Sequence, residues 1–131
     1  MTVVERWEPI VTFIVPGPPR SKERPRFNRK TGAVYTPKTT KEAEKAVVDA
    51  FELAAPLWEP TLEDCRLSID VIYQKARKGD GGNVLKMVED ALNGWAYRDD
   101  KQVIDGHYHT FENGGDSAGV VVTFYIHKGE S

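Results

Sequence analysis

The stretch GDGGNVLKMVEDALNGWAYRDD, residues 79–100, holds a short helical pattern that one aspartate precedes and two aspartates follow. Placed at about 100° per residue, its apolar side chains cover one continuous arc of about 160°, and Asn83, Lys86 and Asp90 share the opposite side. The Asn-Gly pair at 93–94 is typical of a helix C-cap, in which glycine takes the left-handed conformation. The stretch therefore predicts a short amphipathic helix from about residue 82 to residue 93.

Strand patterns lie on both sides of this helix. Upstream, residues 66–74 (RLSIDVIYQ) alternate apolar and polar side chains, so one face is buried and Asp70 points away from it. Downstream, residues 102–111 (QVIDGHYHTF) and 119–127 (GVVVTFYIH) read as two strands. The linker ENGGDSA contains an Asn-Gly dipeptide, which favours a tight hairpin between them.

The N-terminal third adds one strand and one helix. Residues 10–15 (IVTFIV) form a β-rich run that ends at a proline-rich turn. Residues 39–54 carry alanine, valine and phenylalanine at helical intervals, and Thr39 and Glu42 have capping-box spacing. The predicted order is β-α-β-α-β-β, which indicates a single α+β domain over residues 1–131 with one mixed sheet and two helices packed on it.

Charge is distributed unevenly along the chain. Residues 20–38 carry seven basic residues and one acidic residue, a net +6, although the whole chain carries -2. Phe27 and Tyr35 are interleaved with these cations, as in arms that hold phosphates and stack on unpaired bases. We expect residues 16–38 to form a basic DNA-binding surface loop; an ordinary solvated charge run is the alternative.

Cys65 is the only cysteine, which excludes an internal disulfide and a zinc site built from cysteines. The first residues show no targeting pattern, and no apolar run approaches the roughly 20 residues that span a bilayer. We expect a soluble intracellular protein with no membrane partner.

The acids around residues 79–100 suggest a metal site. The helix is about 16–18 Å long, and the six residues after Gly94 can span about 20 Å. Asp99 or Asp100 can thus return to Asp80, and the strand that carries Asp70 leads into the same loop. Crowded carboxylates repel one another unless a cation enters, and oxygen ligands suit Mg²⁺ or Mn²⁺.

Such a site would serve phosphodiester cleavage, with Lys86 stabilising the charge on the phosphate. The alternative is structural: Asp80 caps the helix, Asp99 and Asp100 occupy a solvated turn, and Lys86 pairs with Asp90.

Three segments resemble the RusA family of Holliday junction resolvases, particularly its phage and prophage members: VPGPPRSKERPRF, TPKTTKEAEKAV and, most specifically, GDGGNVLKMVEDALNGWAYRDDKQVID. The family pattern reads approximately Asp-x-Asp-Asn-x-x-Lys, then Asp-Ala-Leu, then Asp-Asp-x-Gln-Val. The matching residues are Asp80, Asn83, Lys86, Asp90, Ala91, Leu92, Asp99, Asp100, Gln102 and Val103.

The resemblance implies a homodimeric, Mg²⁺-dependent endonuclease, with Mn²⁺ as substitute, that nicks branched DNA in the cytoplasm of a bacterium or a phage-infected host. No small-molecule cofactor is expected. Asp80, Lys86 and Asp100 match catalytic residues; Asp80 and Asp100 match metal ligands, with Asp99 and Asp70 as further candidates. The expected DNA contacts are Arg20, Lys22, Arg24, Arg26, Arg29, Lys30, Lys38, Lys75, Arg77, Lys78 and Asn83.

The chain departs from the family pattern at Gly82, where the motif has its second aspartate. Three explanations are open: Asp70, Asp90 or Asp99 supplies the ligand, water takes its place, or the protein binds junctions without cutting them. An RNA-binding accessory protein that uses the basic segment on single strands is a further alternative.

Overall fold

The computed structural model describes residues 5–20, 26–35, 37–77 and 79–130. The main elements have the predicted order, and a small hairpin and two 3₁₀ turns are added. The elements are β1 (Glu5–Pro16), β2 (Arg26–Phe27), β3 (Val34–Tyr35), α1 (Lys38–Ala54), β4 (Cys65–Ile72), α2 (Gly81–Leu92), η1 (Asp100–Gln102), β5 (Val103–Phe111), η2 (Gly115–Ser117) and β6 (Gly119–Glu130). Within these ranges, neither helix is long and apolar enough to span a membrane.

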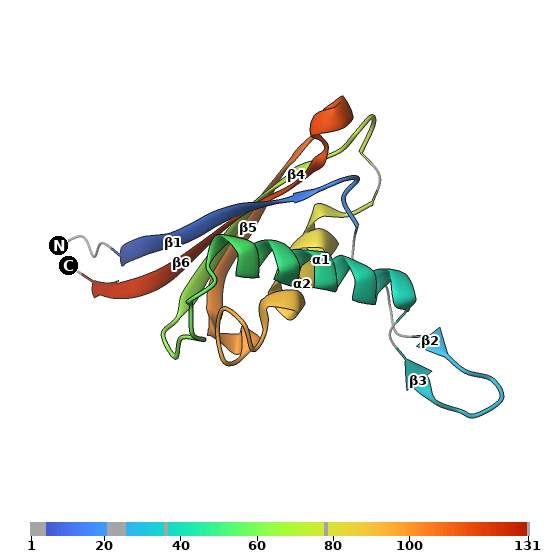
Figure 1. Cartoon of the computed structure of the whole chain (residues 1–131), viewed down its shortest axis with the longest axis horizontal. Helices are drawn as coiled ribbons and strands as arrows, with labels where there is room; N and C mark the ends of the chain where they lie inside the picture. Colours follow the sequence, from blue (N-terminus) through green and yellow to red (C-terminus); the bar gives the residue numbers. More distant parts are fainter. Residues whose placement is uncertain (1–4, 21–25, 36, 78, 131) are drawn as a thin grey trace.

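The main sheet has four strands in the order β1-β6-β4-β5. β4 and β5 run parallel, whereas β6 is antiparallel to both β4 and β1. Both helices lie on one face of this sheet (Figure 1), and their buried side chains join those of the strands in one hydrophobic core. The predicted α+β class, mixed sheet and two packed helices are confirmed.

β4 is the central strand of the core. Buried and half-buried residues alternate along its whole length, which confirms the predicted two-residue period. Leu67, Ile69 and Val71 are buried beneath the helices. Asp70 is half-buried on the opposite face, as predicted.

The predicted hairpin between the last two strands is wrong, because β4 lies between β5 and β6 and bonds to both. The connection, residues 112–118, crosses the end of β4. Asn113 N–H donates to the Lys75 carbonyl at 2.7 Å, and Gly114 N–H donates to the Tyr73 carbonyl at 2.9 Å. Asn113 has a φ of 58°, so the Asn-Gly dipeptide supplies the left-handed residue of a crossover instead of a two-residue turn.

The predicted capping box of the first helix is also wrong. α1 begins at Lys38 with Pro37 as its N-cap and no side-chain cap. The Pro37 carbonyl accepts from the N–H of Thr40 at 3.1 Å. Proline has a fixed φ that is compatible with the start of a helix, so α1 begins directly after Pro37 and Thr39 and Glu42 lie inside it. The Glu42 carboxylate does not cap the helix and is available for ion pairs.

Candidate active site and nucleic-acid interface

Asp80 stands at the N-terminus of α2. Its carboxylate accepts from the Gly82 N–H at 2.8 Å, and its carbonyl accepts from the Asn83 N–H at 3.0 Å. Gly81 lies against β5, because a Cβ at this position would be 2.6 Å from ring carbons of Tyr108. The glycine therefore allows α2 to start in close contact with β5 and places Asp80 beside the second half of that strand.

The polar face of α2 is exposed as predicted. Asn83 and Lys86 are solvent-accessible, whereas Val84, Met87 and Val88 are buried. Lys86 thus lies on the solvent-exposed side of α2, at a position along the helix between Asp80 and Asp100.

A group of acids lies at and beyond the C-terminal end of α2. Burial raises the pKa of Glu89, and the nearby charges of Asp90 and Asp100 raise it further. Burial and hydrogen bonding to Asp99 raise the pKa of Asp100. A hydrogen bond from the Lys101 backbone N–H, at 2.9 Å, lowers the pKa of Asp99. Asp99 therefore stays ionised, and Asp100 is the member of the pair that binds a proton more readily.

Asp80 and Asp100 lie at opposite ends of α2, so the prediction that they meet within one protomer is wrong. The helix has 12 residues and is about 18 Å long at 1.5 Å per residue. Asp80 lies near Tyr108 in the second half of β5, whereas Asp100 precedes the first residue of β5, Val103. Because β5 is parallel to β4, the chain has to return to the starting end of β4 before β5 begins.

The segment after α2 is fixed at that end by its own contacts. Gly94 N–H donates to the Tyr97 carbonyl at 2.8 Å, and Arg98 N–H donates to the Thr61 carbonyl at 3.2 Å. Tyr97 is fully buried, and its hydroxyl donates to the Glu89 carbonyl. These contacts fold the segment compactly, so it does not extend back to the start of the helix.

Asp70 is also separated from Asp80, contrary to expectation. It is in register with His109 and Val121, on the sheet face that the helices leave open. Asp80 lies on the helix side. Across the described ranges, no three His, Cys, Asp or Glu side chains are grouped so that they could hold a metal ion. One protomer does not form the predicted cluster.

The open sheet face carries a polar network that the sequence analysis missed. The Arg66 guanidinium contacts Asp105 at 2.7 Å and lies 4.4 Å from the centre of the Trp7 ring. His107 Nδ1 is 3.2 Å from the same carboxylate. Burial raises the pKa of Asp105, but the bonds with Arg66 and His107 outweigh it and lower that pKa overall. The pairing of β4 with β5 brings these residues together, and no pattern of neighbouring residues in the sequence predicts the network.

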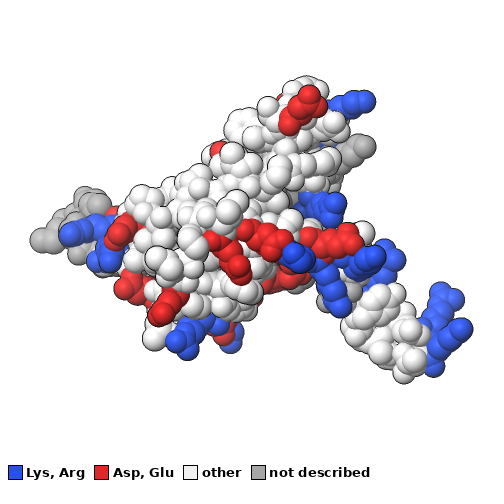
Figure 2. All heavy atoms as spheres, viewed as in Figure 1, with Lys and Arg blue, Asp and Glu red and all other residues white. Residues whose placement is uncertain are grey.

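The predicted basic loop contains the hairpin of β2 and β3, which projects from the body of the domain (Figure 1). Arg26 lies in β2, and Arg29 and Lys30 lie in the turn, where the Asn28 side chain accepts the Lys30 N–H at 2.9 Å. Phe27 is 62% exposed. Figure 2 shows Lys and Arg side chains along this projection. The hairpin therefore offers cations and an accessible ring to a polyanion.

The two ends of the basic segment converge on α1. Arg20 and Lys38 each form an ion pair with Glu42 at 3.8 Å. Lys75 and Arg77 are exposed between β4 and α2. Three predicted DNA contacts lie outside the described residues: Lys22, Arg24 and Lys78.

The sequence matches a model of a known protein family. Residues 16–125 match the family model described as Endodeoxyribonuclease RusA. The match runs from the end of β1 into β6 and includes the basic hairpin, Asp80, Lys86 and Asp100. A search of curated proteins finds no matching sequence.

Proposed function

The chain belongs to the RusA family of endodeoxyribonucleases, and on that basis we propose that it is a metal-dependent endonuclease that nicks branched DNA near the branch point. The family implies a Holliday junction resolvase or related endonuclease. The observation that carries the finer proposal is that Asp80, Lys86 and Asp100 occupy the motif positions within the matched region, in a domain with a projecting basic hairpin.

The carboxylates of Asp80, Asp99 and Asp100 are the oxygen ligands that Mg²⁺ and Mn²⁺ prefer. When bound, such an ion supplies a water of lowered pKa and neutralises charge on the phosphate. Burial, and then the neighbouring acids, raise the pKa values of Glu89 and Asp100, and a nearby divalent cation would offset the repulsion among these carboxylates. Lys86 would contribute its exposed ammonium to the same phosphate.

Two protomers are needed to complete this site. Within one protomer the length of α2 separates Asp80 from Asp100, and the two cannot share an ion across about 18 Å. A two-fold dimer that sets α2 antiparallel to its copy would bring Asp80 of one chain to Asp100 of the other. The proposed homodimer would therefore contain two identical sites, which suits the approximate two-fold symmetry of a four-way junction.

β5 supports such a dimer because it is an edge strand. Ile104, Tyr108 and Phe111 are 55%, 43% and 51% exposed along it, and an unpaired apolar edge tends to pair with another strand. Antiparallel pairing of β5 with its copy would set the Val103 end beside the partner's Phe111 end. Asp100 lies at the Val103 end of β5 and Asp80 lies near the Phe111 end, so this pairing would bring Asp100 of one chain close to Asp80 of the other.

Gly82 favours a second candidate, a junction-binding protein that does not cut. A Cβ at Gly82 would lie 3.2 Å from the Asp80 carboxylate, so the missing motif carboxylate belongs beside Asp80. In the shared site, Asp99 accompanies Asp100 and offers a replacement oxygen. The presence of Lys86 together with Asp80 and Asp100 favours the cutting enzyme.

The test is a cleavage panel with labelled four-way junctions, forks and linear duplex in Mg²⁺ or Mn²⁺. The proposal expects nicks near the branch point that depend on the metal, and binding that weakens with added salt. Tight junction binding without nicks in either metal would support the second candidate. Preference for unstructured RNA over junctions at equal salt would overturn both.

A further inference from the structure

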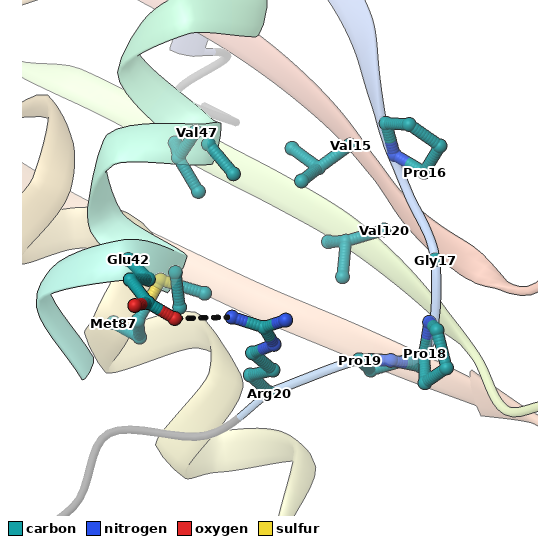
Figure 3. A pocket seen from close by; sticks show the side chains of 12 residues that line it. Val15, Pro16, Gly17, Pro18, Pro19, Arg20, Glu42, Val47, Met87 and Val120 are labelled. Carbon is teal, nitrogen blue, oxygen red and sulfur yellow. Dashed lines mark ion pairs between the residues drawn. The ribbon is translucent and has the colours of Figure 1, made fainter. Parts of the chain in front are cut away.

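A cavity of about 330 Å³ opens between the end of β1, α1 and α2, and its lining includes none of Asp80, Lys86 and Asp100 (Figure 3). This volume lies in the range of about 300–1,000 Å³ typical of small-ligand sites. Its inner wall is apolar, formed by Val15, Val47, Met87 and Val120. The inner wall therefore favours an apolar or weakly polar group over a charged one.

Three prolines form the outer wall of the cavity, and a glycine holds their turn in place. Gly17 has a φ of +98°, and its N–H donates to the Ala118 carbonyl at 3.1 Å. Pro16, Pro18 and Pro19 then line the opening. Proline rings present rigid apolar surfaces, so this wall loses little conformational entropy when a planar group packs on it.

The mouth carries one cation and one anion. Arg20 and Glu42 form an ion pair at 3.8 Å, and their side chains are 57% and 51% exposed. Figure 3 shows this pair across the opening. Exposed ion pairs contribute at most about 1 kcal/mol, so a ligand can separate them. Arg20 then donates hydrogen bonds and Glu42 accepts them, which suits the edge of a nucleobase.

The basic segment begins and ends at this mouth. Arg20 precedes the hairpin, Lys38 follows it, and both contact Glu42 at 3.8 Å. DNA bound along this segment would therefore lie beside the opening of the cavity. At a branch point, unpaired bases leave the stack at a cost of only a few kcal/mol.

We propose that this cavity receives one unpaired nucleobase from the branched DNA, an inference that rests on the proposed junction binding. The base packs between the proline wall and Met87, and its edge contacts Arg20 and Glu42. The cavity is thus a specificity site that recognises an unstacked base, separate from the groups that cut.

Ala46→Phe tests the proposal because Ala46 lines the cavity yet is exposed, so the larger ring fills the space without disturbing the core. Ala54→Phe is the matched control: Ala54 is exposed on the same helix and lies outside the cavity lining. The probes are four-way junctions with 2-aminopurine at successive positions around the branch point, in EDTA to prevent cutting.

With the unmodified protein, one probe position should brighten as its base leaves the stack. Ala46→Phe should abolish that rise and weaken junction binding at least about fivefold, which corresponds to about 1 kcal/mol, the lower end of the range for one stacked base. Its affinity for linear duplex should not change. Ala54→Phe should match the unmodified protein throughout.

Tight junction binding with no fluorescence change at any position would overturn the cavity assignment and leave the proposed function standing. So would an equal loss of junction and duplex affinity in Ala46→Phe. No junction binding by the unmodified protein would overturn both. Glu42→Gln is a second test: this variant should show a smaller rise in 2-aminopurine fluorescence and should keep its affinity for linear duplex.

Discussion

Two substitutions carried on separate chains test whether each active site is shared between protomers. Asp80→Asn keeps an N-cap for α2, because asparagine caps a helix about as well as aspartate and can still accept the Gly82 N–H. Asp100→Asn removes a carboxyl that burial and hydrogen bonding to Asp99 hold at a raised pKa. Both chains should therefore fold and bind junctions.

Each variant alone should lose nicking by at least about a hundredfold, because removing a metal ligand costs no less than removing a group that only orients one. A mixed dimer keeps one site with both aspartates and has one site with neither. Random exchange places about half of the protein in mixed dimers, so the mixture should recover about a quarter of the unmodified activity.

The assay mixes the two purified variants, allows subunit exchange, verifies mixed dimers with tags of different size, and measures nicking of a labelled four-way junction in Mg²⁺. The control mixes Asp80→Asn with a chain that carries both substitutions, because no dimer in that mixture contains an intact site. If verified mixed dimers stay as inactive as this control, the shared site is refuted.

Three further changes test other parts of the structure. Gly81→Ala should lower the free energy of unfolding by about 1–3 kcal/mol in denaturant titrations, because its Cβ would meet the Tyr108 ring at 2.6 Å. Tyr108→Ala in the same chain should recover most of this loss. An unchanged free energy of unfolding in Gly81→Ala would contradict the close approach of α2 to β5. Glu89→Gln should stabilise the protein at pH 7 and make its stability depend less on pH between pH 7 and the usual carboxyl range near 4.5. The reason is that a folded pKa raised above the unfolded one costs stability when the group is ionised, and this cost disappears as pH falls through the folded pKa. A drop in melting temperature at pH 7 would argue against a raised pKa of Glu89 in the folded protein. Gly82→Asp places a Cβ 3.2 Å from the Asp80 carboxylate and so adds a second carboxylate beside it. This variant should need less Mg²⁺ for half-maximal nicking, and its thermal stability should depend more strongly on Mg²⁺; an unchanged metal requirement would show that Gly82 removed no ligand.

Much of the local structure was predictable because its causes lie within a few residues. The alternation in β4 and the apolar face of α2 follow from side-chain periods of two and 3.6 residues. Gly94 has the expected positive φ of 87°. The predicted capping box at Thr39 was wrong because a nearby residue, Pro37, serves as the N-cap of α1 instead.

The sequence by itself determined the element order, the α+β class, the basic segment and the family motif, because each depends on residue types at short, fixed spacings. Only the tertiary structure decided which strands are neighbours. β4 lies between β5 and β6, and its parallel pairing with β5 sends Asp100 to the far end of α2 from Asp80. Strand pairing depends on contacts between distant parts of the chain, which local periodicity does not encode. The separation of the two aspartates within one protomer follows from that pairing, and it is the reason for proposing a site shared between two protomers.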